Sequence, residues 1–168
     1  MNIHIRPETA EDIAGIRDIV AAAFAAVPYS DKTEPLIVEA LRRSGVLAVS
    51  LVAETGGTLA GHVAVSPVSV ADGSRGWYGL GPISVLPEVQ RKGIGTQLME
   101  RALAGLRGMG ASGCVLLGEP GFYGRFGFKP VPGLVFPGAS AGYFQASVFR
   151  GATPKGEVKY HESFYGLL

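Results

Sequence analysis

Apolar residues recur with helical spacing in two stretches near the start of the chain. The two apolar faces comprise Ile13, Ile16, Val20, Phe24 and Val27, followed by Leu36, Ile37, Ala40 and Leu41. The first helix is expected to begin at an N-cap, Thr9, and to end before Pro28. The second is expected to be capped by Asp31 or Thr33 and to end before Gly45, because glycine favours the position just past a helix.

Strand-like segments predict a sheet that is mostly sequential. They cover residues 2–6, 46–54, 59–70 and 76–85. A Gly56-Gly57 pair and a polar turn at 71–74 separate the last three strands, which favours an antiparallel meander. The third of these contains Gly81 and Pro82, and a proline cannot donate a ladder hydrogen bond. That strand is therefore expected to be bulged or to lack a partner on one side there.

A third amphipathic segment follows a glycine-containing loop at residues 86–95. Its apolar face comprises Leu98, Met99, Ala102, Leu103 and Leu106, and its end is expected at Gly108 or Gly110. The continuous apolar run at 114–117 predicts a strand covered on both faces. Strand, helix and strand in this order predict a parallel crossover.

The remaining chain predicts an aromatic segment at 122–128 and strands at 134–136 and 143–149. Residues 155–168 show no readable pattern, although the apolar end at 164–168 is expected to dock on the body of the domain or on a partner. Four apolar residues near 143–149 form either core or a dimer face, so a monomer and a homodimer both stay open. They are Tyr143, Phe144, Val148 and Phe149. Together the elements predict an α+β fold with a mixed sheet.

Composition narrows the class of protein. The 168 residues suggest one domain, residues 1–168, and 17% charged residues with 47% apolar residues argue against disorder. A net charge of +1 argues against nucleic acid as the main partner. One cysteine excludes an intrachain disulfide framework. His and Cys residues do not occur at the spacing of metal ligands, so we expect no metal site. The N-terminus lacks the pattern of a signal peptide, and no run reaches about 18 apolar residues, so we expect a cytoplasmic protein with no membrane span.

The chemistry is concentrated in the loop Gln90-Arg91-Lys92-Gly93-Ile94-Gly95-Thr96, which lies between a strand and a helix. The N-terminus of a helix offers free N–H groups and a positive dipole end, and glycines let phosphate oxygens approach the backbone. The two cations and the threonine hydroxyl add donors, so the loop predicts a phosphate site. No P-loop motif is present, and a dinucleotide fingerprint would need a glycine where Leu98 stands and an acid where Gly113 stands.

Gln90-x-x-Gly93-x-Gly95, entered from a strand ending in Val-Leu-Pro-Glu, resembles the acyl-CoA loop of the GNAT N-acetyltransferases. Residues 83–87 are similar to that family's strand four. Residues 122–128 resemble its later Tyr-x-x-x-Gly-Phe element, and the sequence Tyr-x-Arg-Phe-Gly-Phe is similar to a bacterial subgroup.

The resemblance implies a mixed, mostly antiparallel sheet flanked by helices and splayed between its fourth and fifth strands. Acetyl-CoA would be the cosubstrate, and a primary amine of a small molecule or peptide would attack its thioester directly. A backbone N–H near 83–85 would stabilise the oxyanion, and Tyr123 would protonate the CoA thiolate. The residues implied to bind acetyl-CoA are Ile83, Ser84, Val85, Gln90, Arg91, Lys92, Gly93, Ile94, Gly95 and Thr96.

The base that deprotonates the amine stays open between Glu54, Glu119 and His62. Glu119 follows the strand at the expected splay and is the preferred candidate, although Glu119-Pro120 is also typical of a turn. His62 is expected to face solvent, because it alternates with apolar neighbours along a strand.

Four further residues have less specific predicted roles. Glu34 and Asp31 would form an acidic wall for the amine. Cys114 is expected to be buried and inert, and Arg125 to be solvated or paired with a carboxylate. A non-catalytic acyl-CoA-binding or sensor domain is the alternative function.

Overall fold

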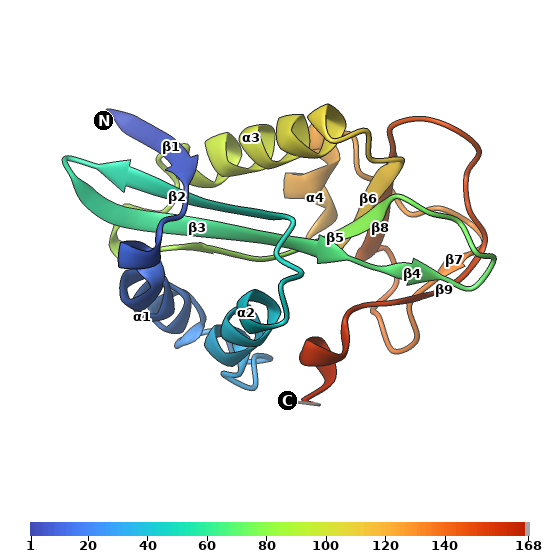
Figure 1. Cartoon of the computed structure of the whole chain (residues 1–168), viewed down its shortest axis with the longest axis horizontal. Helices are drawn as coiled ribbons and strands as arrows, with labels where there is room; N and C mark the ends of the chain where they lie inside the picture. The colour runs from blue at the N-terminus through green and yellow to red at the C-terminus, as the bar shows by residue number, and fades with distance from the viewer. Residues whose placement is uncertain (167–168) are drawn as a thin grey trace.

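The computed structural model describes residues 1–166, which form a six-stranded sheet with helices on both faces (Figure 1). The strand order is β1-β2-β3-β5-β6-β8, and every pair is antiparallel except β5 with β6. The strands are β1 (Ile3–Pro7), β2 (Val49–Thr55), β3 (Thr58–Pro67), β5 (Trp77–Val85), β6 (Gly113–Leu117) and β8 (Phe144–Val148). The mixed, mostly antiparallel sheet and the parallel crossover are confirmed.

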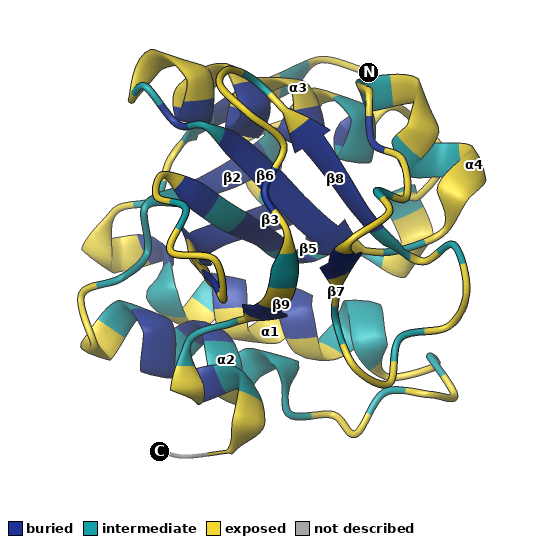
Figure 2. Ribbon diagram, turned by 90° about the vertical axis from the view of Figure 1, so that its right-hand side faces the viewer, coloured by how far each residue is buried: buried dark blue, intermediate teal, exposed yellow. Residues whose placement is uncertain are grey.

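The helices divide between the two faces of this sheet. Helix α3 (Ile94–Gly108) covers one face, and α1 (Ile13–Phe24) and α2 (Glu34–Arg43) cover the other (Figure 1). A short 3-10 turn, Ala10–Asp12, precedes α1, and a one-turn helix, α4 (Pro120–Tyr123), follows β6. Figure 2 shows the central strands buried between helices with exposed outer surfaces. Among residues 1–166, no helix has the length and apolar character needed to cross a membrane.

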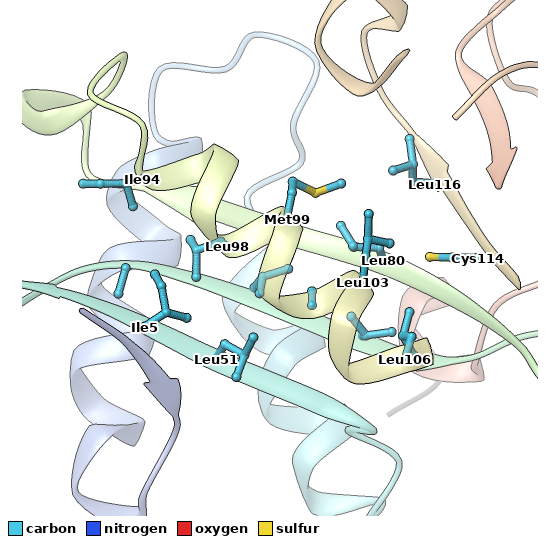
Figure 3. Packing of buried hydrophobic residues seen from close by; sticks show 14 of the residues in the cluster. Ile5, Leu51, Leu80, Ile94, Leu98, Met99, Leu103, Leu106, Cys114 and Leu116 are labelled. Carbon is cyan, nitrogen blue, oxygen red and sulfur yellow. The ribbon is translucent and has the colours of Figure 1, made fainter. Parts of the chain in front are cut away.

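The larger core lies between α3 and the sheet. Helical spacing places one face of α3 inward, toward Ile5, Leu51 and Leu80 (Figure 3). The buried residues of α3 are Ile94, Leu98, Met99, Ala102, Leu103 and Leu106. A Cβ added at Gly61 of β3 would lie 3.0 Å from Ile94 Cγ2. This glycine therefore allows the N-terminus of α3 to pack directly on the sheet.

The predicted strand at 59–70 is divided between two sheets, because its last residues belong to a second, three-stranded sheet. β3 ends at Pro67, and the chain continues as β4 (Ser69–Val70), which pairs with β9 (Gly156–Lys159) instead of the main sheet. Pro67 has no N–H for a further ladder bond, which favours a break at this point. β7 (Leu134–Val135) also pairs with β9, so the predicted strand at 134–136 belongs to the second sheet. β9 itself lies in the segment for which the sequence showed no pattern.

Two element boundaries and one buried face also differ from expectation. α1 ends at Phe24, so Val27 lies outside it, and Leu36 is 49% exposed although it was expected to be buried. β2 begins at Val49 because Val46 donates its N–H to the Leu41 carbonyl and closes α2. The helix end therefore uses the residue from which the strand was predicted to start.

The two parallel strands pair over only three residues and then separate. Trp77–Gly79 of β5 pairs with Gly113–Val115 of β6, and no described strand pairs with the same edge of β5 beyond Gly79. On its other edge, β5 shifts register at Gly81 and Pro82, which confirms the predicted bulge. The strands are therefore splayed where the resemblance implied, and the free edge of β5 faces the gap.

Candidate active site

The loop between β5 and α3 is shaped by two residues with left-handed backbone conformations. Arg91 has φ +63° and Gly93, the N-cap of α3, has φ +89°. Gln90 Nε2 donates to the Val85 carbonyl at 3.1 Å, which holds the start of the loop against β5. The first intrahelical bond runs from Gln97 N–H to Gly93, so the earlier N–H groups of the helix point out of its end. These groups and the helix dipole create an anion site.

A pocket of about 580 Å³ lies against this helix end and the free edge of β5. It is lined by Ile83, Val85, Gln90, Arg91, Gly93, Ile94, Gly95, Thr96, Phe122 and Arg125. We call it the donor pocket. It brings together all the residues implied to bind acetyl-CoA except Ser84 and Lys92. The Ser84 side chain is buried on the other face of the sheet, and Lys92 is exposed and outside the lining.

Phe122 and Arg125 form the wall of the donor pocket that sequence reasoning missed. The Arg125 guanidinium lies 4.8 Å from the centre of the Phe122 ring and 5.3 Å from that of Phe126. Its Nη2 donates to Thr96 Oγ1 at 3.3 Å. Arg125 is exposed, in line with the predicted solvated state, and its guanidinium stacks on aromatic rings beside the helix end. Its spacing of three residues from Phe122 was the available signal, because that places both on one helical face.

Tyr123 is the last residue of α4, the one-turn helix that follows β6. Its ring packs against Gly118, where a Cβ would collide with it, and makes an edge-to-face contact with Phe122 at 4.9 Å. Burial raises the pKa of Tyr123 to about 12, and Tyr29 adds to this shift. The phenol is therefore protonated at neutral pH.

Glu119 is the N-cap of α4. Its two carboxylate oxygens accept hydrogen bonds from the N–H groups of Gly121 and Phe122, each at 2.9 Å. Pro120 occupies the first helical position, where its missing N–H costs nothing. The structure thus gives Glu119 a capping interaction that positions Phe122 and Tyr123. Its role as a base stays a prediction.

A second pocket, of about 300 Å³, lies on the α1 and α2 side of the sheet. It reaches the same bulge of β5, and we call it the acceptor pocket. It is lined by Phe24, Glu34, Ile37, Leu80, Gly81, Pro82, Leu117, Phe136, Tyr160, Phe164 and Tyr165. Sequence reasoning singled out only Glu34 among these for the amine. Four aromatic residues within 136–165 were the available signal, but no local period linked them to a site.

The C-terminal segment forms one wall of the acceptor pocket. A 3-10 turn, Glu162–Tyr165, follows β9 and packs beside α2 (Figure 1). The expectation that 164–168 docks on the body is met by Phe164 and Tyr165, while residues 167 and 168 lie outside the described part of the chain.

His62 is fully buried, so the prediction that it faces solvent is wrong. Its strand face is covered by α1 and α2, and its Nε2 lies 2.8 Å from Ser50 Oγ and 3.7 Å from Glu8 Oε1. Burial lowers the pKa of His62, which therefore stays neutral at pH 7. Arg42 donates two hydrogen bonds to Glu8, at 2.8 and 2.9 Å. We call Glu8, Arg42, Ser50 and His62 the buried polar cluster.

The other predicted polar residues have defined partners or surroundings. Glu54 forms an ion pair with Arg6 at 2.6 Å, and Asp31 accepts hydrogen bonds from the N–H and hydroxyl of Thr33. Cys114 is fully buried as expected, and burial raises the pKa of its thiol. In residues 1–166, no three His, Cys, Asp or Glu side chains cluster as metal ligands would.

Comparison with known proteins defines the family. Residues 4–131 match a family model described as an acetyltransferase (GNAT) domain. The chain therefore belongs to the GNAT family of acetyltransferases, as the resemblance indicated.

Two relatives match this chain over nearly their whole length. An uncharacterized N-acetyltransferase of Escherichia coli K12, YhbS, is 31% identical over 95% of this chain and 97% of its own. A GNAT acetyltransferase from Brucella melitensis, solved in complex with acetyl-CoA, is 48% identical with a TM-score of 0.87, covering 97% of this chain and 98% of that one. The structure of YhbS in complex with CoA has a TM-score of 0.88, covering 98% of this chain and 93% of that one. The expected fold is thus confirmed.

Proposed function

We propose that this protein transfers the acetyl group of acetyl-CoA to a primary amine of a small molecule or peptide. The observation that carries the proposal is the donor pocket, where the helix end of α3 meets the free edge of β5. The Brucella melitensis relative, at 48% identity, was solved with acetyl-CoA, and YhbS was solved with CoA.

The residues of the donor pocket fit such a cosubstrate. A pyrophosphate is an anion, and the N–H groups at the start of α3 suit it together with the guanidinium groups of Arg91 and Arg125. The backbone of Ile83 and Val85 suits the pantetheine amides, because an extended group adds to an open strand edge as a further strand does. The Ser84 side chain faces away, so only its backbone contributes in this proposal.

Acetyl-CoA supplies a thioester carbonyl, and the residues at the splay supply the rest of the chemistry. The neutral amine attacks the carbonyl carbon, and a backbone N–H near 83–85 stabilises the resulting oxyanion. Tyr123 donates its phenolic proton to the sulfur as the carbon–sulfur bond breaks. The amine nitrogen loses one proton to solvent, and Tyr123 regains one, so the protons balance. A phenol whose pKa is about 12 is a weak acid, but it remains protonated at neutral pH and so keeps a proton available for the sulfur.

Glu119 remains a predicted base in this scheme. Because both of its oxygens already accept backbone N–H bonds, Glu119→Gln and Glu119→Ala separate its two possible roles. Glutamine retains one capping oxygen but no basicity. If kcat falls equally in both variants at neutral pH, Glu119 acts as a base; if only alanine lowers it, Glu119 acts as a cap.

Thermal unfolding with and without acetyl-CoA, with NADH as a control, is the first test. Acetyl-CoA at 100 times its Kd adds about 2.7 kcal/mol to the folded state. For a domain of this size that corresponds to a rise in Tm of roughly 5–10 °C. Release of CoA thiol in the presence of an amine then establishes catalysis. A rise in Tm without turnover for any amine would favour the acyl-CoA-binding alternative.

A further inference from the structure

We propose that the acceptor pocket selects a small primary amine with an aromatic or branched apolar body, and that Glu34 attracts its ammonium group. This inference rests on the proposed function, since it assigns the class of amine that receives the acetyl group.

The position of the acceptor pocket relates it to the reaction. It is lined by Leu80, Gly81 and Pro82 of the β5 bulge and by Leu117 at the end of β6. These are the segments between which the parallel strands separate. The donor pocket meets the same strand at Ile83 and Val85, on the α3 side. An amine in the acceptor pocket therefore approaches the thioester from the opposite face of the sheet.

The walls of the acceptor pocket are mainly apolar and aromatic. The rings of Phe136 and Tyr160 are 5.2 Å apart, and those of Tyr160 and Phe164 are 5.0 Å apart, both edge-to-face. The Tyr165 hydroxyl accepts a hydrogen bond from the Tyr160 backbone N–H at 3.2 Å, which engages its one strongly polar group. A substrate that carries several hydroxyl or amino groups would leave them without partners against these rings, at a cost in free energy.

Glu34 is the one charged side chain in the described lining of this pocket. It is half-buried at the start of α2, and Ser30 Oγ lies 2.7 and 2.8 Å from its two oxygens. The carboxylate is thus oriented, and it retains acceptor capacity for a second donor. A single carboxylate beside apolar walls fits a ligand with one cationic end and an apolar remainder.

The volume limits the length of the amine. About 300 Å³ is at the lower end of the range for small-molecule sites. A phenyl or branched alkyl group with a short amine arm fits this space. A folded protein surface does not enter a pocket whose walls come from α1, α2 and the C-terminal segment.

The test is steady-state release of CoA thiol from acetyl-CoA with three amines: 2-phenylethylamine, putrescine and glucosamine. We expect kcat/KM for 2-phenylethylamine to exceed that of each polar amine at least tenfold. Equal or better turnover of putrescine or glucosamine overturns the assigned class but leaves the proposed function standing. No turnover of any amine, with acetyl-CoA still raising the Tm, overturns the proposed function itself.

Glu34→Gln tests the cationic end of the pocket. We expect KM for 2-phenylethylamine to rise about five- to tenfold, because the ion pair is partly exposed. The KM for acetyl-CoA stays within twofold. Glu39→Gln removes the same charge from the same helix, but Glu39 pairs with Arg17 outside the pocket, so amine kinetics are unchanged. An unchanged KM in Glu34→Gln, or an equal rise in Glu39→Gln, overturns the role of Glu34.

Discussion

The two faces of the splayed sheet form their pockets in different ways. On the α3 face, the donor pocket comes from residues 83–96 and two residues of the segment after β6. On the α1 and α2 face, the acceptor pocket takes side chains from Phe24 near its start to Tyr165 near its end. One site is nearly contiguous in sequence and relies on backbone, while the other is assembled from distant side chains.

Because one pocket relies on backbone and the other on side chains, substitutions should affect the two pockets differently. In the proposed function, the donor pocket would bind phosphate through N–H groups, a helix dipole and two glycines, and most side chains offer no substitute for these. The acceptor pocket depends on the size and polarity of its walls. One face therefore suits a shared cosubstrate, and the other suits a variable amine.

The two faces also differ in how their cores are built. The buried cluster under α3 contains only apolar residues and Cys114. The face under α1 and α2 combines a smaller apolar cluster with the buried polar cluster of Glu8, Arg42, Ser50 and His62. The contribution of the buried polar cluster to the stability of the protein should therefore depend on pH.

The largest effect is expected at Tyr123, the proposed proton donor, which follows the splayed strand β6. Tyr123→Phe removes the proton donor for the leaving thiolate, so we expect kcat to fall about 100- to 1000-fold with KM for acetyl-CoA within twofold. Tyr143→Phe, at a residue that is 43% exposed, is the matched control and should leave kcat unchanged. A Tyr123→Phe variant with wild-type kcat would show that another group protonates the sulfur.

Gly95→Ala should weaken the donor face alone. An added Cβ lies 3.7 Å from the Phe122 ring and 4.0 Å from Val85, which is ordinary contact, so the free protein accommodates it. It occupies the surface where phosphate would approach the backbone, and we expect KM for acetyl-CoA to rise about tenfold. Calorimetry should give an equal or slightly higher Tm, since alanine stabilises a helix relative to glycine by about 0.5–1 kcal/mol. A lower Tm would mean that the Cβ disturbs packing instead.

Arg125→Gln should have a smaller effect on the same face. Loss of the guanidinium leaves the helix end intact, so we expect KM for acetyl-CoA to rise roughly three- to fivefold at low salt. The difference from wild type should shrink as salt is added, because exposed charges are screened. Arg75→Ala, an exposed arginine away from both pockets, controls for net charge. Equal effects of the two substitutions would contradict a local role for Arg125.

The smallest effect on turnover is expected from the buried polar cluster, which should act on stability. Burial lowers the pKa of His62 in the folded state, so the unfolded chain binds its proton first as pH falls below about 6.5. The contribution of neutral His62 to stability is thus present above that pH and is lost on acidification. His62 faces Glu8, Ser50 and Arg42. Burial opposes the ionisation of Glu8, but its interactions with His62, Arg42 and Ser50 together outweigh burial and lower its pKa, so the contribution of Glu8 is lost at lower pH.

Urea unfolding at pH 7.5 and pH 5.5 measures this dependence. A single group changes the free energy of unfolding by at most about 1.4 kcal/mol per pH unit. His62→Gln should flatten the dependence between these two pH values and leave KM for acetyl-CoA unchanged. If the free energy of unfolding of His62→Gln still changed with pH as in the wild type, the pH dependence would arise from other groups.

Much of the donor face was predictable because its features are local. Gly93 and Gly95 at a strand-to-helix junction, the apolar face of α3 and the bulge at Gly81 and Pro82 all follow from residues adjacent in sequence. The aromatic contacts of Arg125 were not predictable, because its stacking depends on where α4 places Phe122. Ser84 illustrates a further limit, since alternation along β5 turns its side chain away from the gap.

The sequence by itself determined the α+β class, the bulge of β5 and a helix N-terminus with free N–H groups at the start of α3, while the splay of β5 and β6 was implied by the resemblance to the GNAT family. Backbone conformation and helix polarity are properties of contiguous residues, so the bulge and the helix end need no distant partner. Only the tertiary structure decided that β4 leaves the main sheet, that His62 is buried, and that Tyr160 and Phe164 wall the acceptor pocket. Each of these depends on which segments pack against one another, and packing is selected by the burial of the whole chain at once.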